Sequence, residues 1–240
     1  MRSNPDIDGV LLVDKASGMT SHDVVAITRR ALDTRKIGHC GTLDPLATGL
    51  LILTIGRGTK IQDLLMSEDK EYVGTMRLGA VTDSQDADGE IVETRPVPAL
   101  DHARIEAAFA KFRGDFYQMP PMVSAIKKDG VPLYRLARQG KQVEREPRFV
   151  HVYTAEVLGL ALPDVDFRVV CSKGFYVRTF AHDVGGELGC GAHLRALRRT
   201  KSGKFSVEGA VTVEELRTLP LSSLRERVLS LPAVSRLRGA

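Results

Sequence analysis

Apolar positions along the chain follow two periods, one typical of strands and one typical of helices. Short apolar runs at residues 10–13 and 50–55 predict buried strands, and the alternating run at 72–78 predicts another. Residues 21–32 repeat apolar side chains near the helical period and begin with residues that can cap a helix. The same reasoning predicts helices at 61–65, 101–112, 179–188 and 192–198, and strands at 150–160 and 167–171. Strands separated by helices of uneven length predict an α+β domain with one mixed sheet.

Composition sets the class of protein. At 240 residues and 43% apolar content, the chain can bury about 70–75% of its unfolded surface, which is enough for one large domain. It has no run of 18 apolar residues, and its first residues are polar. We therefore expect no membrane span, no secretory signal and a cytoplasmic location. The three cysteines, Cys40, Cys171 and Cys190, form no Cys-x-x-Cys pair, so we expect free thiols.

Positive charge gathers in two stretches. The net charge of +4 is too small an excess to identify a nucleic-acid-binding protein by itself. Residues 195–204 hold five cations and no acid, and residues 123–148 hold seven cations against three acids. Either stretch alone fits a solvated surface, whereas two stretches flanking a candidate site favour contact with phosphates. The seven cations are Lys127, Lys128, Arg135, Arg138, Lys141, Arg145 and Arg148.

One short segment carries the strongest chemical signal. The run from Gly41 to Leu50 places a single acid, Asp44, among small and turn-forming residues, and Pro45 keeps Asp44 out of the helical region. Gly41 and Gly49 let the backbone approach a flat substrate. An isolated Asp-Pro pair is most simply an ordinary turn. The whole string from residue 39 to 49, however, resembles the catalytic-aspartate motif of the TruB family, bacterial tRNA pseudouridine synthases that modify uridine 55 of the T loop.

The resemblance extends over nearly all of the chain, from residue 8 to about residue 216. The matching segments follow the family's order. One departure is visible, since Ala16 stands where the family usually has proline, and it removes no chemical group. Besides the Asp44 segment, the matches are residues 8–15, 18–21, 69–72, 77–89, 171–179 and 189–199.

The resemblance implies a pseudouridine-synthase-like fold, with a mixed, largely antiparallel sheet flanked by helices and a central RNA-binding cleft. It places the catalytic domain at residues 1–218. The Gly- and Pro-containing excursion at about 118–147 matches the thumb that closes over the RNA hairpin. Residues 219–240 then form a short C-terminal tail, and we expect the family's small C-terminal RNA-binding domain to be absent.

The chemistry that the resemblance implies needs few groups. Pseudouridine formation breaks the bond between N1 and the sugar and joins C5 to the same sugar carbon, so we expect no metal ion and no organic cofactor. One ionised carboxylate suffices where water is excluded, and Asp44 matches the family's catalytic aspartate. Arg178 matches the arginine beside it, where a guanidinium holds an Asp pKa below its ordinary value. Attack on C6, attack on the sugar carbon and elimination stay open.

Other matched positions imply contacts with the RNA. Tyr72 and Tyr176 match aromatic residues at the base, where stacking is worth about 1–3 kcal/mol. His39 matches a histidine that meets the RNA, Leu197 an apolar residue lining the uracil pocket, and Lys60 a lysine near phosphate. Without the resemblance, each of these five would be interpreted as a packing or surface residue.

The sequence thus predicts an isomerase that flips a uridine out of the T-arm stem-loop of tRNA. We expect a monomer that needs no protein partner and no membrane. One alternative is a non-catalytic RNA-folding module, against which the intact Asp44, Tyr72 and Arg178 argue. Another is a relative that takes its target from a guide RNA and partner proteins, for which a thumb would be superfluous.

Overall fold

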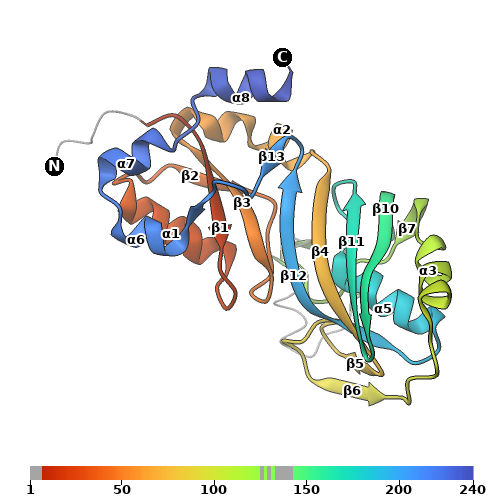
Figure 1. Ribbon diagram of the computed structural model, residues 1–240. Helices are drawn as coiled ribbons and strands as arrows, with labels where there is room; N and C mark the ends of the chain where they lie inside the picture. The colour runs from red at the N-terminus through yellow and green to blue at the C-terminus, as the bar shows by residue number, and fades with distance from the viewer. Residues whose placement is uncertain (1–6, 125–126, 129–130, 133–142, 240) are drawn as a thin grey trace. The chain divides into compact units, whose positions relative to one another are not determined.

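The computed structural model describes residues 7–124, 127–128, 131–132 and 143–239 (Figure 1). The chain forms two compact units. The first unit combines Met1–Glu71 with Arg198–Ala240, and the second consists of Tyr72–Leu197. None of the helices in these described ranges is long and apolar enough to cross a membrane.

The first unit is built on an apolar central strand. Strand β3 is buried along almost its whole length, as expected for a strand that is covered on both faces of the sheet. It pairs antiparallel with β1 and with β2, and β1 pairs in parallel with β14. The strands are β1 (Gly9–Lys15), β2 (Ile37–Cys40), β3 (Thr48–Ile55), β13 (Phe205–Ser206) and β14 (Val211–Thr212). The helices are α1 (Ser21–Ala31), the 3-10 helix η1 (Gly56–Ile61), α2 (Gln62–Met66), α6 (Val213–Thr218), α7 (Leu221–Glu226) and α8 (Leu231–Arg238).

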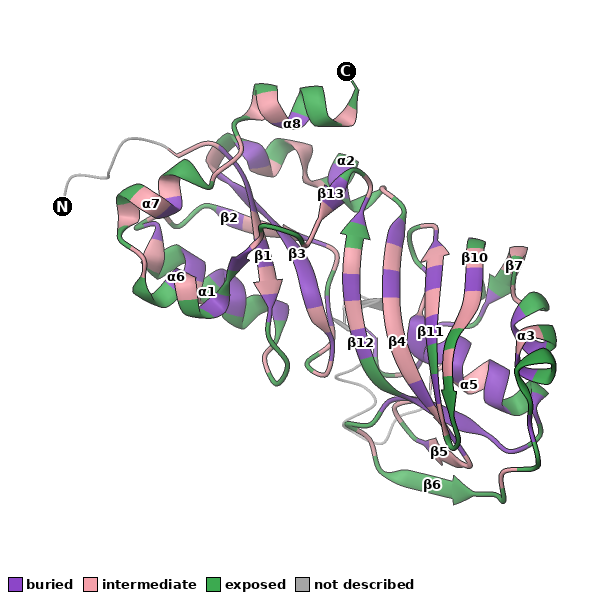
Figure 2. Cartoon of the chain, viewed as in Figure 1, coloured by how far each residue is buried: buried purple, intermediate pink, exposed green. Residues whose placement is uncertain are grey.

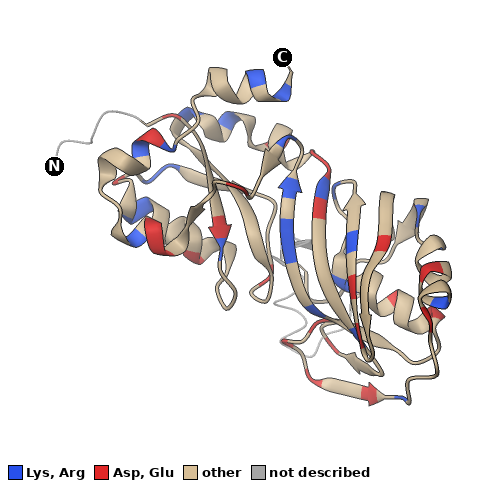
Figure 3. Ribbon diagram, in the orientation of Figure 1, with Lys and Arg blue, Asp and Glu red and all other residues tan. Residues whose placement is uncertain are grey.

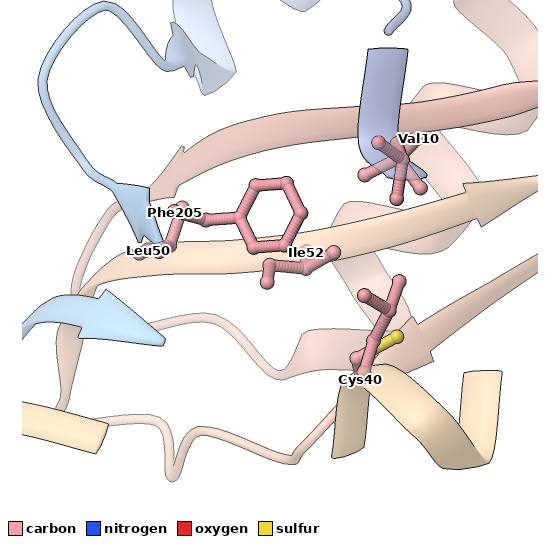
Figure 4. Packing of buried hydrophobic residues seen from close by; sticks show 7 residues of the cluster. Val10, Cys40, Leu50, Ile52 and Phe205 are labelled. Carbon is pink, nitrogen blue, oxygen red and sulfur yellow. The ribbon is translucent and has the colours of Figure 1, made fainter. Parts of the chain in front are cut away.

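The C-terminal residues contribute to the core of the first unit. Val10, Ile52 and Phe205 form a buried apolar cluster (Figure 4), and Val234 of α8, with 1% of its surface exposed, belongs to it. Val10 also exchanges two main-chain hydrogen bonds with Leu229, of 2.9 and 2.8 Å. Within residues 219–239, part of the stretch expected to be a short tail, the chain forms α7 and α8, and α8 packs onto β1. Burying one such aliphatic side chain stabilises the fold by about 1.5–3 kcal/mol.

In its described residues, the second unit combines strands of the main sheet, two separate pairs of strands (β5–β6 and β8–β9) and two helices. Strand β10 pairs antiparallel with β11 on one side and with β7 on the other. The strands are β4 (Lys70–Leu78), β5 (Ala80–Thr82), β6 (Ile91–Thr94), β7 (Gly114–Gln118), β8 (Lys127–Lys128), β9 (Val131–Pro132), β10 (Arg148–Ala161), β11 (Asp164–Cys171) and β12 (Ala192–Ser202), and the helices are α3 (His102–Ala110) and α5 (Val177–Glu187). The chain passes between the two units within β4 and within β12.

Aromatic side chains hold the two helices of the second unit against its sheet. Phe180 of α5 is fully buried, and its ring lies 5.2 Å from Phe109 of α3 and 5.7 Å from Phe167 of β11. Such edge-to-face pairs contribute about 0.5–1.5 kcal/mol beyond the area they bury. Figure 2 shows the buried residues along α5. The rings therefore fix the start of α5, where two predicted site residues lie.

Hydrogen bonds join the main strands in the order β14-β1-β3-β12-β4-β11-β10-β7. The pairs β1–β14 and β3–β12 are parallel, and the pairs within each hairpin are antiparallel. A mixed sheet with flanking helices confirms the α+β class predicted from the sequence.

One predicted element is wrong. Residues 192–198 were expected to form a helix, because Leu194 and Leu197 recur at helical spacing, but they belong to strand β12. The strand pairs in parallel with β3 through Arg198 and Arg199, and antiparallel with β13 further on. Sheet hydrogen bonds to distant segments override a local preference of well under 1 kcal/mol per residue.

The excursion at 118–147 is described only in part. It leaves β7 at Gln118 and returns at Arg148, and β8 and β9 within it pair antiparallel, with Lys127 opposite Pro132. Of the cations expected to contact phosphates, Arg135, Arg138 and Lys141 lie outside the described residues. The thumb assigned to residues 118–147 stays a prediction.

Candidate active site

Asp44 opens a tight turn between β2 and β3. The Ala47 N–H donates to the Asp44 carbonyl (3.1 Å), and Pro45 takes the second position, where its fixed φ favours such turns. The Ser21 hydroxyl accepts from the Leu43 N–H (2.9 Å) and donates to the Leu43 carbonyl (3.2 Å). The Asp44 side chain is half-buried. The Asp-Pro turn is therefore real, and it holds the carboxylate on a backbone fixed on both sides.

A buried lysine ties this turn to the end of β1. Lys15 has no exposed surface, and its ammonium donates to the carbonyls of Ala16 (2.9 Å), Met19 (2.7 Å) and Pro45 (3.2 Å). The Gly18 N–H donates to the same Pro45 carbonyl (2.9 Å). A buried ammonium is tolerated only when its donors are satisfied, so these bonds fix both segments together. The segment keeps this anchor although Ala16 replaces the family's usual proline.

His39 lies on β2, five residues before Asp44. Its ring meets that of His22 edge-on, with centroids 5.3 Å apart, and its Nδ1 is buried without a hydrogen-bond partner in the described structure. Burial lowers the pKa of His39 to about 4, and the charges of His22 and Arg199 act in the same direction. The ring is therefore neutral at physiological pH. A buried nitrogen without a partner is an atom that a ligand can satisfy.

Arg178, the second residue of α5, has only 4% of its side chain exposed. Its guanidinium donates to the carbonyls of Ser84 (3.1 Å) and Val123 (2.8 Å), and Nε lies 3.5 Å from Asp86 Oδ2. Arg178 is therefore not a solvated surface cation. Two segments of the second unit, the loop at 84–86 and the chain at Val123, thus fix the orientation of this guanidinium.

Asp86 is a candidate site residue to which the sequence reasoning assigned no role. Its carboxylate, 5% exposed, accepts from the Ser84 hydroxyl (2.6 Å) and the Asp88 N–H (3.2 Å), while the Thr82 hydroxyl binds its carbonyl (2.7 Å). The segment 77–89 had matched the family, but nothing in its spacing says that one of its acids is buried against Arg178. A buried charge needs an opposite charge or hydrogen bonds, and this pair supplies both.

Tyr176 and Tyr72 occupy different settings. The main chain of Tyr176, which precedes α5, exchanges two hydrogen bonds with the Gln118 amide (2.8 and 3.1 Å). Tyr72 lies on β4 with 9% of its surface exposed. Two residues further along β4, a Cβ added at Gly74 would lie 3.2 Å from Cδ1 of Leu197 and 2.9 Å from the carbonyl of Ala196. Gly74 therefore lets Leu197 lie against β4.

The predicted site residues are distributed over both units. The first unit holds His39 on β2, Asp44 in the turn and the exposed Lys60 on η1. The second unit holds those expected to bind the base. These are Tyr72 on β4, Tyr176 and Arg178 at the start of α5, and Leu197 on β12.

Most cations of the basic stretch at 195–204 have partners within the protein. Arg198 forms a two-bonded ion pair with Asp14 (3.0 and 2.7 Å), and Lys201 lies 3.5 Å from Glu71. Arg195 is paired with Asp164, and Arg199 is buried. Figure 3 shows positive residues along β12. The phosphate contacts expected of this stretch stay a prediction, and buried Arg199 is the member least able to make one.

The cysteines confirm the predicted free thiols, since Cys40, Cys171 and Cys190 are all unbridged and buried. Burial raises the pKa of Cys40 to about 12, so this neighbour of His39 is an unreactive thiol at physiological pH.

Two family models together match most of the chain. Residues 29–177 match the model of the TruB family pseudouridylate synthase N-terminal domain, and residues 178–232 match the tRNA pseudouridylate synthase B C-terminal domain. The second match includes α7, within the stretch expected to be a tail.

Relatives share most of this sequence. The chain is 59% identical over 224 residues to tRNA pseudouridine synthase B of Opitutus terrae, covering 93% of each, and 48% identical over 225 residues to that of Syntrophotalea carbinolica, covering 94% of this chain and 74% of the relative. Among solved structures, a Cbf5-Nop10-Gar1 complex matches with a TM-score of 0.73 and 29% identity over 98% of this chain and 68% of the other. An H/ACA RNP bound to a substrate RNA matches with a TM-score of 0.70 and 27% identity over the same shares. The chain therefore belongs to the TruB family of pseudouridylate synthases.

Proposed function

We propose that this protein isomerises uridine 55 in the T loop of tRNA to pseudouridine, with Asp44 as the catalytic carboxylate. The observation that carries the proposal is the Asp44 turn, whose backbone is fixed by hydrogen bonds from Ser21 and Lys15. Relatives at 59% and 48% identity are named tRNA pseudouridine synthase B, which supports tRNA as the substrate. The matches to Cbf5 complexes have lower identity, 29% and 27%. They support the guide-RNA alternative less strongly than the relatives at 59% and 48% identity support tRNA as the substrate.

The reaction balances within the substrate. The N1–C1′ bond breaks, the base turns, and a C5–C1′ bond forms, while C5 gives up one proton and N1 gains one. No electrons leave the substrate, so the proposal includes no metal and no organic cofactor. Attack on C6, attack on C1′ and elimination all begin from the same ionised carboxylate, and a prepositioned Asp44 serves each of them.

The residues of the second unit have complementary proposed roles. Arg178 supports the ionised form of the catalytic carboxylate, a role suited to a guanidinium fixed by Ser84, Val123 and Asp86. Tyr72 and Tyr176 stack on the flipped base, and Leu197 lines its pocket. In the first unit, neutral His39 meets the RNA through its free nitrogen and exposed Lys60 meets a phosphate.

The T-arm hairpin is the part of tRNA that we expect the protein to recognise. We propose that the segment 118–147 closes over the T arm, that the protein acts as a monomer, and that it works without a protein or guide-RNA partner. Flipping a loop uridine costs a few kcal/mol, which stacking and phosphate contacts offset. A hairpin of the T arm is then a sufficient substrate.

The test uses a T-arm hairpin carrying uridine labelled with tritium at C5, because each turnover releases that label to water. Asp44→Asn keeps the size of the side chain and removes its charge, so release should fall below detection while folding and hairpin binding persist. Asp63→Asn, the same change at an exposed position on α2, is the matched control and should keep full activity. Release at the wild-type rate from a folded Asp44→Asn protein would refute the proposed role.

Two further experiments test whether the protein needs a partner and whether it needs a metal ion. Purified protein without added RNA or protein should convert the hairpin, and failure that a guide RNA or cell extract repairs would support the guide-RNA alternative. Excess chelator should leave turnover on the hairpin unchanged. Loss of turnover that zinc or magnesium restores would contradict the metal-free reaction.

A further inference from the structure

Arg199 on β12 is the largest fully buried side chain of the described structure, with 1% of its surface exposed. Its Nε donates to the Leu50 carbonyl (2.7 Å) and its Nη2 donates to the Gly41 carbonyl (3.1 Å). Gly41 and Leu50 are the two ends of the segment that contains Asp44. One planar guanidinium therefore closes this segment at both ends.

The contact with Arg199 also explains why residues 41 and 49 of this segment are glycines. Gly49 has a φ of +96° and pairs with Arg199, and a Cβ there would lie 2.3 Å from the Arg199 carbonyl oxygen. Gly41 has a φ of +85°, and a Cβ there would lie 3.3 Å from Arg199 Nη1. The two glycines make room for one residue of β12, a role that the sequence did not indicate.

The chemistry of the contact suits arginine in particular. Burying a charge is costly, and in the described part of the chain the hydrogen bonds of Arg199 go to carbonyls, with no carboxylate in ion-pair range. A rigid fork of donors can bind two carbonyls held at a fixed separation, whereas the single ammonium of lysine presents no such plane. Its charge reaches β2, where it lowers the pKa of His39.

We propose that Arg199 is a positioning residue that sets the place of the Asp44 carboxylate by joining Gly41 to Leu50, an inference that rests on the proposed function. Lys15 and Ser21 hold the middle of the segment, and Arg199 holds its ends. A side chain with 1% exposure does not offer its guanidinium to an RNA phosphate. Arg199 thus acts on turnover and leaves the electrostatic part of RNA binding to other residues.

The experiment compares two changes at this position with one on another strand. Arg199→Met keeps the length and apolar stem but removes both donors, and Arg199→Lys keeps the charge but not the fork. Arg168→Met on β11 is the matched control, because the Arg168 guanidinium pairs with Glu156 and was not expected to contact the substrate. All are assayed by tritium release from the hairpin at a temperature where each is folded.

Arg199→Met should lower kcat by about 100-fold, the usual effect of a displacement near 1 Å in a reacting group, with KM little changed. Arg199→Lys should fall between Met and wild type, and Arg168→Met should keep the wild-type kcat. The slope of hairpin affinity against salt should match wild type, since a lost phosphate contact would reduce it by about 0.7–0.9.

Wild-type kcat in a folded Arg199→Met or Arg199→Lys protein would overturn the inference. So would a reduced salt slope with normal turnover, which would make Arg199 a phosphate contact. If Arg199→Met does not fold, Arg199→Lys decides by its split between kcat and KM. A wild-type protein that releases no tritium would refute the proposed function, whereas an active wild type with an equally active Arg199→Met refutes only the role of Arg199.

Discussion

His39 should make the stability of the protein depend on pH. Its pKa is lowered from 6.5 to about 4 in the folded protein by burial, aided by the charges of His22 and Arg199. Between these values the unfolded chain binds a proton that the folded chain does not, so unfolding is favoured as pH falls. The stabilisation is fully present above about pH 6.5 and is lost as pH falls toward 4.

The magnitude follows from the same two values. The His39 pKa of 6.5 in the unfolded chain and about 4 in the folded protein correspond to a contribution of at most about 3 kcal/mol to the free energy of unfolding. About 2 kcal/mol of this contribution is lost between pH 7 and pH 5. His39 is only half-buried, so solvent screening reduces the loss over this interval to roughly 1 kcal/mol. The measurement is urea unfolding of wild type and His39→Gln over this pH range. The Gln variant cannot take up the proton, so it should lose about 1 kcal/mol less than wild type.

Two controls sharpen this test. His22→Gln removes a charge that lowers the His39 pKa, so this variant should show a smaller pH dependence than wild type. Hairpin binding near neutral pH should show the same salt slope in wild type and His39→Gln, because the ring that meets the RNA is neutral. Equal pH dependence in wild type and His39→Gln would refute the reasoning about its burial.

Three further predictions concern other elements. Asp86→Asn should destabilise the protein by about 2–3 kcal/mol and lower kcat, since it removes the buried negative charge that lies 3.5 Å from the Arg178 guanidinium; thermal unfolding and tritium release check both. Gly49→Ala should cost roughly 2–4 kcal/mol in urea unfolding, because its φ of +96° and the overlap at 2.3 Å cannot both be relieved, and a loss under 1 kcal/mol would contradict this. Lys127→Ala with Lys128→Ala should reduce the salt slope of hairpin binding by about 0.7–0.9 per lost contact, and an unchanged slope would mean that these lysines stay in solvent.

Sequence patterns located elements well where the local signal and the tertiary setting agree. The run at 50–55 is apolar because β3 is buried along nearly its whole length, and it is a strand as predicted. Residues 179–188 lie almost entirely in α5 for the corresponding reason. The prediction failed at 192–198, where leucines at helical spacing belong to a strand, because pairing with β3 outweighs weak local preference.

The candidate site divides in the same way. The Asp44 string was visible in the sequence because a turn with proline and flanking glycines needs those residue types wherever it occurs. The burial of Asp86 against Arg178 was not visible, because the two are far apart in the chain and any acid of the 77–89 segment could have been the one buried. A count of charges in the 195–204 stretch did not show which of its cations have partners within the protein.

The sequence alone determined the α+β class, the identity of the candidate catalytic carboxylate and the family, because these depend on residue types in a local order. Only the tertiary structure decided that α8 completes the core of the first unit, that Arg178 is buried beside Asp86, and that Arg199 closes the Asp44 segment. The physical reason is that burial and hydrogen-bond partners come from segments distant in sequence. The sequence gives the charge of a side chain, but whether that charge contacts solvent, a carbonyl or a carboxylate depends on how distant segments pack.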